Sequence, residues 1–219
     1  MAAGHGDQQG RTLTRDKDAT RQRILDAAEE VFAEKGYHAT VVDDIIRASD
    51  SSKGGFYFHF PNKQAIFLSL IDALVPKLAG AIDRAVESEE NPIGQLDAAL
   101  RTVLDIFSRH RKLSKILLVE AVGLGHGFDE KLMRTRKQFA SMIQKRLDIA
   151  VASGLLEPFD TETVAWAWFG AINELVVRWL VMREPERLDD VLPILRAVLL
   201  RSIGAPMPFP SYQREGAAE

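Results

Sequence analysis

Apolar side chains recur at the spacing of an α-helix through almost the whole chain, and this spacing constrains the fold more than any other feature. The clearest stripes are Ile24, Leu25, Ala28, Val31 and Phe32 near the start, and Leu188, Val191, Leu192, Leu195, Val198 and Leu199 near the end. Such spacing places each set on one helical face. No pair of alternating segments joined by hairpin-type residues appears. The sequence therefore predicts an all-α fold with about nine helices.

The composition excludes several kinds of site. The 219 residues are 46% hydrophobic and 27% charged, as in a globular protein of one or two domains. Because the chain has no cysteine, it can form neither disulfide bonds nor cysteine-ligated metal sites. The histidines are scattered, no nucleophile signature is found, and Gly123–Phe128 lacks the spacing of a dinucleotide-binding loop. We expect no enzymatic activity, no metal and no cofactor.

The net charge of −3 gives no general attraction to nucleic acid. Residues 11–63 hold nine Lys or Arg and nine Asp or Glu, which balance. From Arg47 to Lys63, however, three cations accompany a single anion, Asp50. A nucleic-acid interface on this chain must therefore be local.

Composition and helix signals divide the chain into four parts. We expect a disordered arm, a small helical domain, a larger helical domain and an irregular tail, at residues 1–17, 18–64, 65–204 and 205–219. The arm is rich in Gly, Gln and charge and has no periodicity. Asp18 or Thr20 is expected to cap the first helix and Thr40 a short second one. Pro76 is expected to kink a long helix or mark its weak point, and residues 112–122 are expected to form a single apolar helix. The tail is rich in proline.

The most apolar segment, Thr163–Met182, contains Asn173, Glu174 and Arg178. A membrane span would bury each charge at a cost of about 2.5–3.5 kcal/mol. The first residues also lack the apolar core of a secretory signal. We expect a cytoplasmic protein without a membrane span.

The helix expected at residues 161–182 is apolar over most of its circumference. Such a helix is expected to be covered by a second copy of the chain, and the alternative is that it forms the central helix of a monomer.

The stretch Ser49–Gln64 has phenylalanine at every second position, at Phe56, Phe58 and Phe60. Period two suggests a strand, and an aromatic run suggests a ligand-lining segment. No partner strand is nearby, whereas a short helix precedes the run and Ser52 can cap a second one. Two short helices joined by a tight turn form a helix-turn-helix, which places its second helix in the major groove of DNA. Glycines in that helix, Gly54 and Gly55, suit close approach to another surface.

Residues 19–67 carry a spaced pattern that resembles the DNA-binding domain of TetR-type transcriptional repressors. The matching positions are Thr20, Arg21, Ile24, Leu25, Ala27, Ala28, Phe32, Gly36, Tyr37, Thr40, Val42, Ile45, Ala48, Ser52, Lys53, Gly54, Tyr57, His59, Phe60, Lys63 and Phe67. The chain departs from the pattern at Ile46, Asp50 and Ser51. Asp50 stands where a turn glycine is usual, and aspartate tolerates the left-handed conformation better than most residues.

The resemblance implies which residues meet DNA. Thr40, Tyr57, His59 and Lys63 would contact phosphates, and Ser52, Lys53, Gly54 and Gly55 would face the groove or base edges. Lys53 can donate to guanine O6 and N7. The alternatives are a solvated charge for Lys53 and a helix-end hydrogen bond for His59. We expect the three phenylalanines to anchor the core of the small domain.

The resemblance further implies a homodimer through residues 161–182 and 188–203, a near-palindromic double-stranded DNA operator, and an effector cavity in the larger domain. The expected lining residues are Phe107, Leu117, Glu120, Met133, Phe139, Met142, Trp168, Phe169 and Asn173. Their apolar character indicates a small hydrophobic effector, with Glu120 and Asn173 as polar partners. A regulator without an effector, an activator, or a helical binding or scaffold protein with a non-functional helix-turn-helix are the alternatives.

Overall fold

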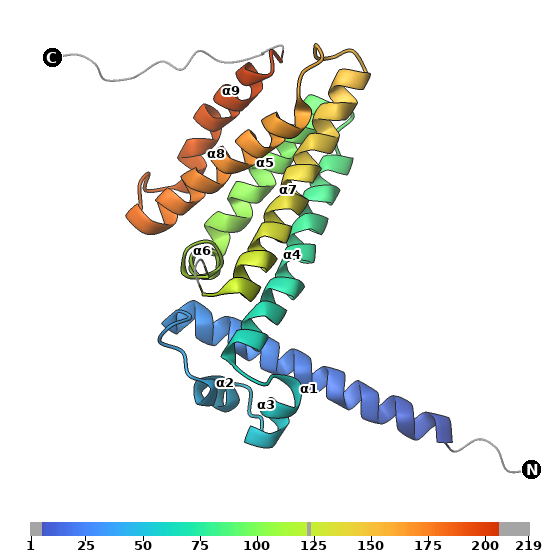
Figure 1. Ribbon diagram of the computed structural model, residues 1–219, viewed down its shortest axis with the longest axis vertical. Helices are drawn as coiled ribbons and strands as arrows, with labels where there is room; N and C mark the ends of the chain where they lie inside the picture. Colours follow the sequence, from blue (N-terminus) through green and yellow to red (C-terminus); the bar gives the residue numbers. More distant parts are fainter. Residues whose placement is uncertain (1–5, 122–123, 206–219) are drawn as a thin grey trace, which may run out of the picture.

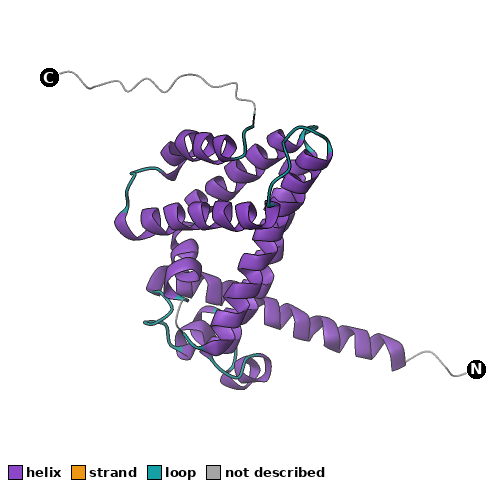
Figure 2. Cartoon of the chain, turned by 45° about the horizontal axis from the view of Figure 1, so that its top comes forward, coloured by secondary structure: helices purple, strands orange, loops and turns teal. Residues whose placement is uncertain are grey.

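The computed structural model describes residues 6–121 and 124–205, and every regular element in them is helical (Figures 1 and 2). Eleven elements follow one another: α1 (Gly6–Lys35), α2 (Val42–Ala48), α3 (Lys53–His59), α4 (Lys63–Glu87), α5 (Pro92–Arg109), α6 (Arg111–Lys115), the π-helix η1 (Ile116–Glu120), α7 (His126–Ala152), α8 (Thr161–Met182), the 3-10 helix η2 (Leu188–Val191) and α9 (Leu192–Ser202). The all-α expectation is confirmed for these residues.

The first three helices form a small domain at one end of the molecule (Figure 1). Gly36 ends α1 in the left-handed conformation, with φ of 81°, and its amide donates to the Phe32 carbonyl at 2.8 Å. Ile24 and Phe32 of α1, Ile45 of α2 and Phe56 of α3 are all fully buried and share one core. Their burial fixes the angle at which α3 is presented.

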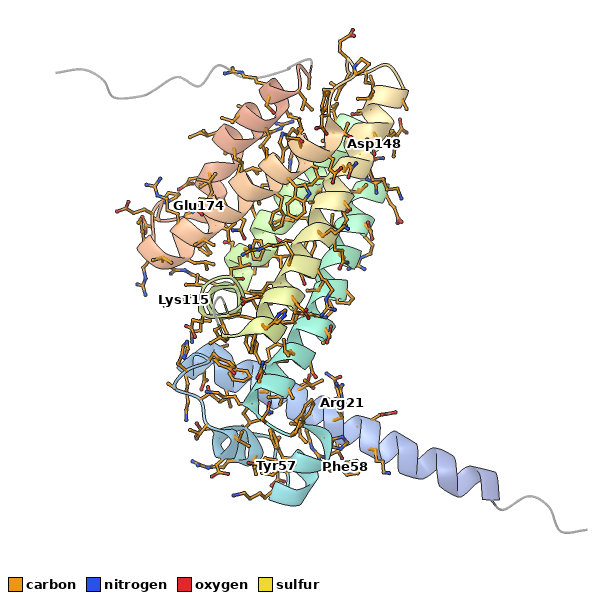
Figure 3. The ribbon with its side chains drawn as sticks, viewed as in Figure 1. Arg21, Tyr57, Phe58, Lys115, Asp148 and Glu174 are labelled. Atoms are coloured by element: carbon orange, nitrogen blue, oxygen red, sulfur yellow. The ribbon has the colours of Figure 1, made fainter. Side chains whose placement is uncertain are left out.

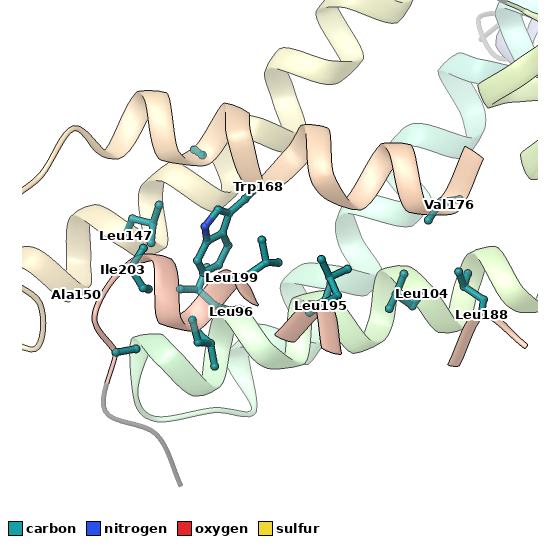
Figure 4. Close-up of a cluster of buried hydrophobic side chains, with 14 of the residues drawn as sticks. Leu96, Leu104, Leu147, Ala150, Trp168, Val176, Leu188, Leu195, Leu199 and Ile203 are labelled. Atoms are coloured by element: carbon teal, nitrogen blue, oxygen red, sulfur yellow. The ribbon is translucent and has the colours of Figure 1, made fainter. Parts of the chain in front are cut away.

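The larger part of the chain is a helical bundle in which α4, α5 and α7 run along one another (Figure 1). α8 packs on α7, and α9 packs on α5. Figure 4 shows their common core, in which Trp168 lies among leucines of α5 and α9. The indole Nε1 of Trp168 donates to the Ser202 hydroxyl at 3.0 Å, so its polar edge is satisfied inside the core.

An aromatic cluster joins the two parts. Phe67 of α4 lies with its ring centroid 5.3 Å from Phe32, 5.0 Å from Tyr37 and 5.6 Å from Phe128 of α7. Phe32, Phe67 and Phe128 are buried almost completely. The small domain is therefore packed directly on α4 and α7 and does not hang from a flexible linker.

Three expectations about helix ends are wrong. α1 begins at Gly6, so residues 6–17 are helical rather than irregular, and neither Asp18 nor Thr20 caps it. The last helix begins as a 3-10 turn. Thr40 does not cap α2, which starts after Val41, whose amide donates to the Asp44 carboxylate at 3.3 Å. Residues 1–5 and 206–219, expected to be irregular, lie outside the described part.

By length and composition alone, α4 and α8 are long and apolar enough to cross a membrane. Both are packed in the bundle, α4 against α5 and α8 against α7. Glu174 and Arg178 of α8 are exposed, as charged side chains on the surface of a folded bundle are. Pro76, expected to kink α4 or mark its weak point, lies within a continuous helix.

Candidate nucleic-acid interface and effector cavity

The turn between α2 and α3 positions the candidate reading helix. Asp50 adopts φ of 48°, as expected from its tolerance of the left-handed conformation. The Ser51 amide donates to the Ile46 carbonyl at 3.2 Å and the Asp50 amide to Arg47 at 3.4 Å, the bonding pattern of a Schellman turn. The hydroxyls of Ser49 and Ser51 lie 2.8 Å apart, so a hydrogen bond between them joins the two sides of the turn. Ser52 then caps α3 by accepting the Gly55 amide at 3.0 Å.

The two faces of α3 have different roles. Phe56 and Phe60 are buried in the core of the small domain, as expected. Phe58 was expected there too, but its side chain is 66% exposed. Tyr57 is 45% exposed beside it, and Figure 3 shows both at the end of the molecule farthest from the bundle. The exposed face of α3 therefore offers two aromatic side chains to a partner.

Lys53 and Gly54 extend this exposed face. The Lys53 ammonium lies 3.9 Å from Asp43, both largely exposed, so this ion pair is weak. A Cβ built on Gly54 meets nothing within 4 Å, whereas one on Gly55 would lie 3.1 Å from the Ser52 hydroxyl. No intramolecular contact requires glycine at position 54. We define the α3 face as Lys53, Gly54, Tyr57 and Phe58.

Thr40 and Lys63 were expected to contact DNA phosphates, but their side chains form contacts within the small domain. The Thr40 hydroxyl is buried and donates to the Gly36 carbonyl at 2.7 Å. The Lys63 ammonium donates to the carbonyls of Tyr37 at 2.7 Å, His38 at 3.4 Å and Thr40 at 2.8 Å. Burial lowers the pKa of Lys63. Both side chains stabilise the loop that joins α1 to α2. In this geometry neither side chain is available to bind a phosphate.

Further cations surround the α3 face. The Lys17 ammonium lies 5.2 Å from the centroid of Phe58, and the Arg21 guanidinium lies 5.2 Å from that of Phe60. Arg47 is exposed near the turn. His59 is half-buried at the end of α3, with its ring centroid 5.0 Å from that of Phe58. Phe58 and Lys17 are functional candidates that sequence reasoning missed.

A cavity of about 410 Å³ runs through the bundle between α4, α5, α7, α8 and α9. It is lined by most of the predicted residues, namely Phe107, Leu117, Phe139, Met142, Trp168, Phe169 and Asn173. Met133 and Glu120 are not among its lining residues. Met133 is 55% exposed on the outer side of α7. The described part of the chain contains no cluster of residues suited to hold a metal ion.

Glu120 instead connects the bundle to the small domain. Its carboxylate accepts the backbone amide of Tyr37 at 2.8 Å, just after α1. It is the last residue of the π-helix η1, and Leu117 and Leu118 of the same element line the cavity. The five-residue element η1 therefore contacts the cavity through its leucines and the small domain through Glu120.

Two family models match the chain. The model described as "Bacterial regulatory proteins, tetR family" matches residues 24–70, which include α2 and α3. The model described as "Tetracyclin repressor-like, C-terminal domain" matches residues 89–200, more than half of the chain.

Individual proteins agree with these matches. The regulator TtgR of Pseudomonas putida is 28% identical over 183 residues, which cover 78% of this chain and 83% of TtgR. The repressor BepR of Brucella suis is 26% identical over 200 residues, which cover 87% and 95%. The structure of FadR from Bacillus subtilis in complex with stearoyl-CoA superposes with a TM-score of 0.75 at 22% identity, covering 83% of this chain and 98% of FadR, and so shares the fold.

Proposed function

Because this chain belongs to the TetR family of bacterial transcriptional regulators, we propose that it is a cytoplasmic, dimeric repressor that releases its operator when a small hydrophobic effector occupies the cavity. As a member of that family it is a regulator of transcription and not an enzyme. The observation that carries the DNA-binding proposal is the exposed α3 face, whose side chains have little structural role of their own.

The α3 face has the chemistry of a DNA-binding surface. Lys53 is a hydrogen-bond donor to guanine, Tyr57 offers a hydroxyl for a phosphate, and Phe58 can pack on a thymine methyl group. Gly54 lets the helix backbone approach the groove floor, since no side chain stands there. Helix-turn-helix proteins present such a helix to the major groove.

Substitution of Gly54 and Tyr57 tests this surface. Gly54→Ala is expected to raise the free energy of unfolding by about 1 kcal/mol, because alanine is the better helix former, yet to weaken operator binding. Tyr57→Ala should weaken binding by about 1–3 kcal/mol with little change in stability. Gel shifts with the duplex flanking the protein's own gene, at several salt concentrations, and urea unfolding measure both quantities. Lys115→Ala, at an exposed site on α6 far from α3 (Figure 3), is the control. Unchanged affinity in both α3 variants would refute the interface.

Apolar side chains on α8 and α9 support the dimer proposal. Trp166 and Val181 of α8 and Ile194 and Val198 of α9 are exposed, the last three by more than half. Gly170 of α8 has open space where a side chain would stand, so another helix can approach closely there. We propose that this surface pairs with the same surface of a second copy, which places two reading helices on adjacent half-sites.

Light scattering is expected to give twice the chain mass of 24.4 kDa. Val198→Asp should produce monomers and reduce operator affinity roughly a hundredfold, because two linked reading heads bind far more tightly than one. Met133→Asp places the same charge at an exposed apolar site on α7 and should change neither quantity. A wild-type monomer at all concentrations would contradict the proposal.

The cavity supports the effector proposal. It is enclosed by five helices of the bundle and lined mostly by apolar side chains, as small-molecule sites are. FadR, which has the same fold, was crystallised in complex with stearoyl-CoA, and this supports a hydrophobic effector for the present chain. An effector acts here only if it favours the form that does not bind DNA.

A further inference from the structure

The shape of the cavity favours long and narrow ligands. Lining residues recur on successive turns of α4 from Ile71 to Val86, and along α7 from Leu132 to Arg146. At a rise of about 1.5 Å per residue, each series spans roughly 21–23 Å. α4 and α7 lie beside each other along this length, and Lys131 of α7 bonds to Asp72 of α4 near one end. The cavity is therefore an elongated channel that starts near the small domain and ends at the far end of the bundle.

The two ends of this channel differ in polarity. Near the small domain the lining is mostly apolar, with Ile71 and Leu74 of α4, Leu117 and Leu118 of η1, and Leu132 of α7, and its polar members there are Thr135 and Arg136 of α7. At the far end the lining includes Lys145, Arg146 and Arg196 together with Asp83 and Asp97. A ligand that matches both ends must have an apolar tail and a polar head.

The ion pairs at the far end of the channel indicate which charge the head of the ligand should carry. The Asp97 carboxylate is almost buried, forms an ion pair with Arg196 Nε at 2.7 Å and accepts a hydrogen bond from Arg101 Nε at 2.9 Å. Arg146 is half-buried and points to the channel from the same face of α7 as Phe139 and Met142. No ion pair of Arg146 is found in the described residues. With Asp97 paired to two arginines, Lys145 and Arg146 remain against Asp83, so the far end has an excess of positive charge.

We propose that the effector is a long, single-chain amphiphile whose anionic head is bound by Arg146 at the far end of the channel and whose alkyl tail extends toward η1 and the small domain. This inference rests on the proposed effector function of the cavity. Arginine suits carboxylate and phosphate heads because its guanidinium donates two parallel hydrogen bonds. Lys145, which is exposed and also lines the channel next to Arg146, adds positive charge at this end.

Binding to the full-length protein, measured by calorimetry below the micelle concentration, tests the ligand class without DNA. Hexadecanoate and hexadecanoyl-coenzyme A share the anionic head and the tail, and comparison of the two shows which head the far end prefers. Octanoate should bind at least about a hundredfold more weakly, because the apolar half of the channel stays empty. Hexadecyltrimethylammonium has the same tail with a cationic head and is expected not to bind.

Two arginines on one helix face provide matched variants. Arg136 also lines the channel on α7, but nearer the small domain than Arg146. Arg146→Gln should weaken hexadecanoate binding about tenfold or more, since a charge-assisted hydrogen bond is lost, and Arg146→Lys should restore part of it. Arg136→Gln should weaken it less than Arg146→Gln does, because Arg136 would lie beside the alkyl tail and not beside the head. Thermal unfolding of each variant verifies that the fold is retained.

The outcomes separate this inference from the proposed function. Equal binding of the cationic amphiphile, no binding of any amphiphile, or a larger loss in Arg136→Gln than in Arg146→Gln would overturn the inference. Gel shifts without amphiphile test operator binding independently, so loss of the ligand class leaves the regulator proposal intact. If hexadecanoate binds more tightly than octanoate and the cationic amphiphile, and also releases the operator, both the inference and the proposed function are supported.

Discussion

Replacement of Phe67 by alanine is expected to lower the free energy of unfolding by about 3–5 kcal/mol, the usual cost of removing a buried aromatic ring. Phe67 is fully buried at the centre of the aromatic cluster, in contact with Phe32, Tyr37 and Phe128. Because these rings come from α1, the loop after it, and α7, the cavity left behind loosens the small domain from the bundle. Operator affinity should fall as well, since in the proposed dimer the two reading helices would lose their fixed spacing.

Urea unfolding and gel shifts measure this prediction. Phe58→Ala is the matched control, because it removes the same ring from an exposed position. We expect Phe58→Ala to change the unfolding free energy by less than about 0.5 kcal/mol while it weakens operator binding. If Phe67→Ala cost less than Phe58→Ala, the aromatic cluster would not be the joint between the two parts.

Replacement of Lys63 by methionine is expected to destabilise the protein by about 2–4 kcal/mol. The ammonium group of Lys63 satisfies three backbone carbonyls after α1 and lies 4.4 Å from the Tyr37 ring centroid. Hydrogen bonds from charged groups contribute about 1.5–3 kcal/mol, and acceptors left buried without a donor add to the loss. Methionine keeps a similar apolar stem and removes the ammonium group, with its charge and its hydrogen-bond donors.

The same variant distinguishes a structural role from a phosphate contact. If Lys63 bound a DNA phosphate, Lys63→Met would leave thermal stability unchanged and reduce the salt dependence of operator binding by about one unit of slope. The structure predicts the opposite, a lower unfolding temperature with an unchanged salt slope for the folded fraction. Lys77→Met, an exposed lysine on the same helix, is the control for the loss of one positive charge.

The fold was largely accessible from the sequence because apolar periodicity marks buried helix faces. Residues 161–182 were expected as one helix and form α8 with those bounds. The first turns of α1 were missed because residues 6–17 have no apolar stripe, so periodicity gives no signal there. α6 and η1 were read as one helix, since a π-turn leaves no mark on an apolar run.

The interface was accessible only in part. Phe58 could have been placed correctly, because residues two apart on a helix point in nearly opposite directions, while Phe56 and Phe60, four apart, share a face. The contacts of Lys63 and Glu120 could not be predicted, since their partners are backbone groups that tertiary packing brings close. The Glu120 carboxylate and the Tyr37 amide are 83 residues apart in sequence. Matched positions in a family pattern identify a surface but do not tell a contact residue from one that supports it.

The π-helix η1 has a consequence for how this protein can diverge. A π-turn holds one residue more than an α-turn, and each residue rotates a helix by about 100°. Deleting one residue from Ile116–Glu120 would restore regular winding and turn the Glu120 carboxylate away from the Tyr37 amide while the leucines still faced inward. A single-codon deletion is thus expected to keep the α3 face and the cavity while it removes the hydrogen bond that links η1 to the small domain.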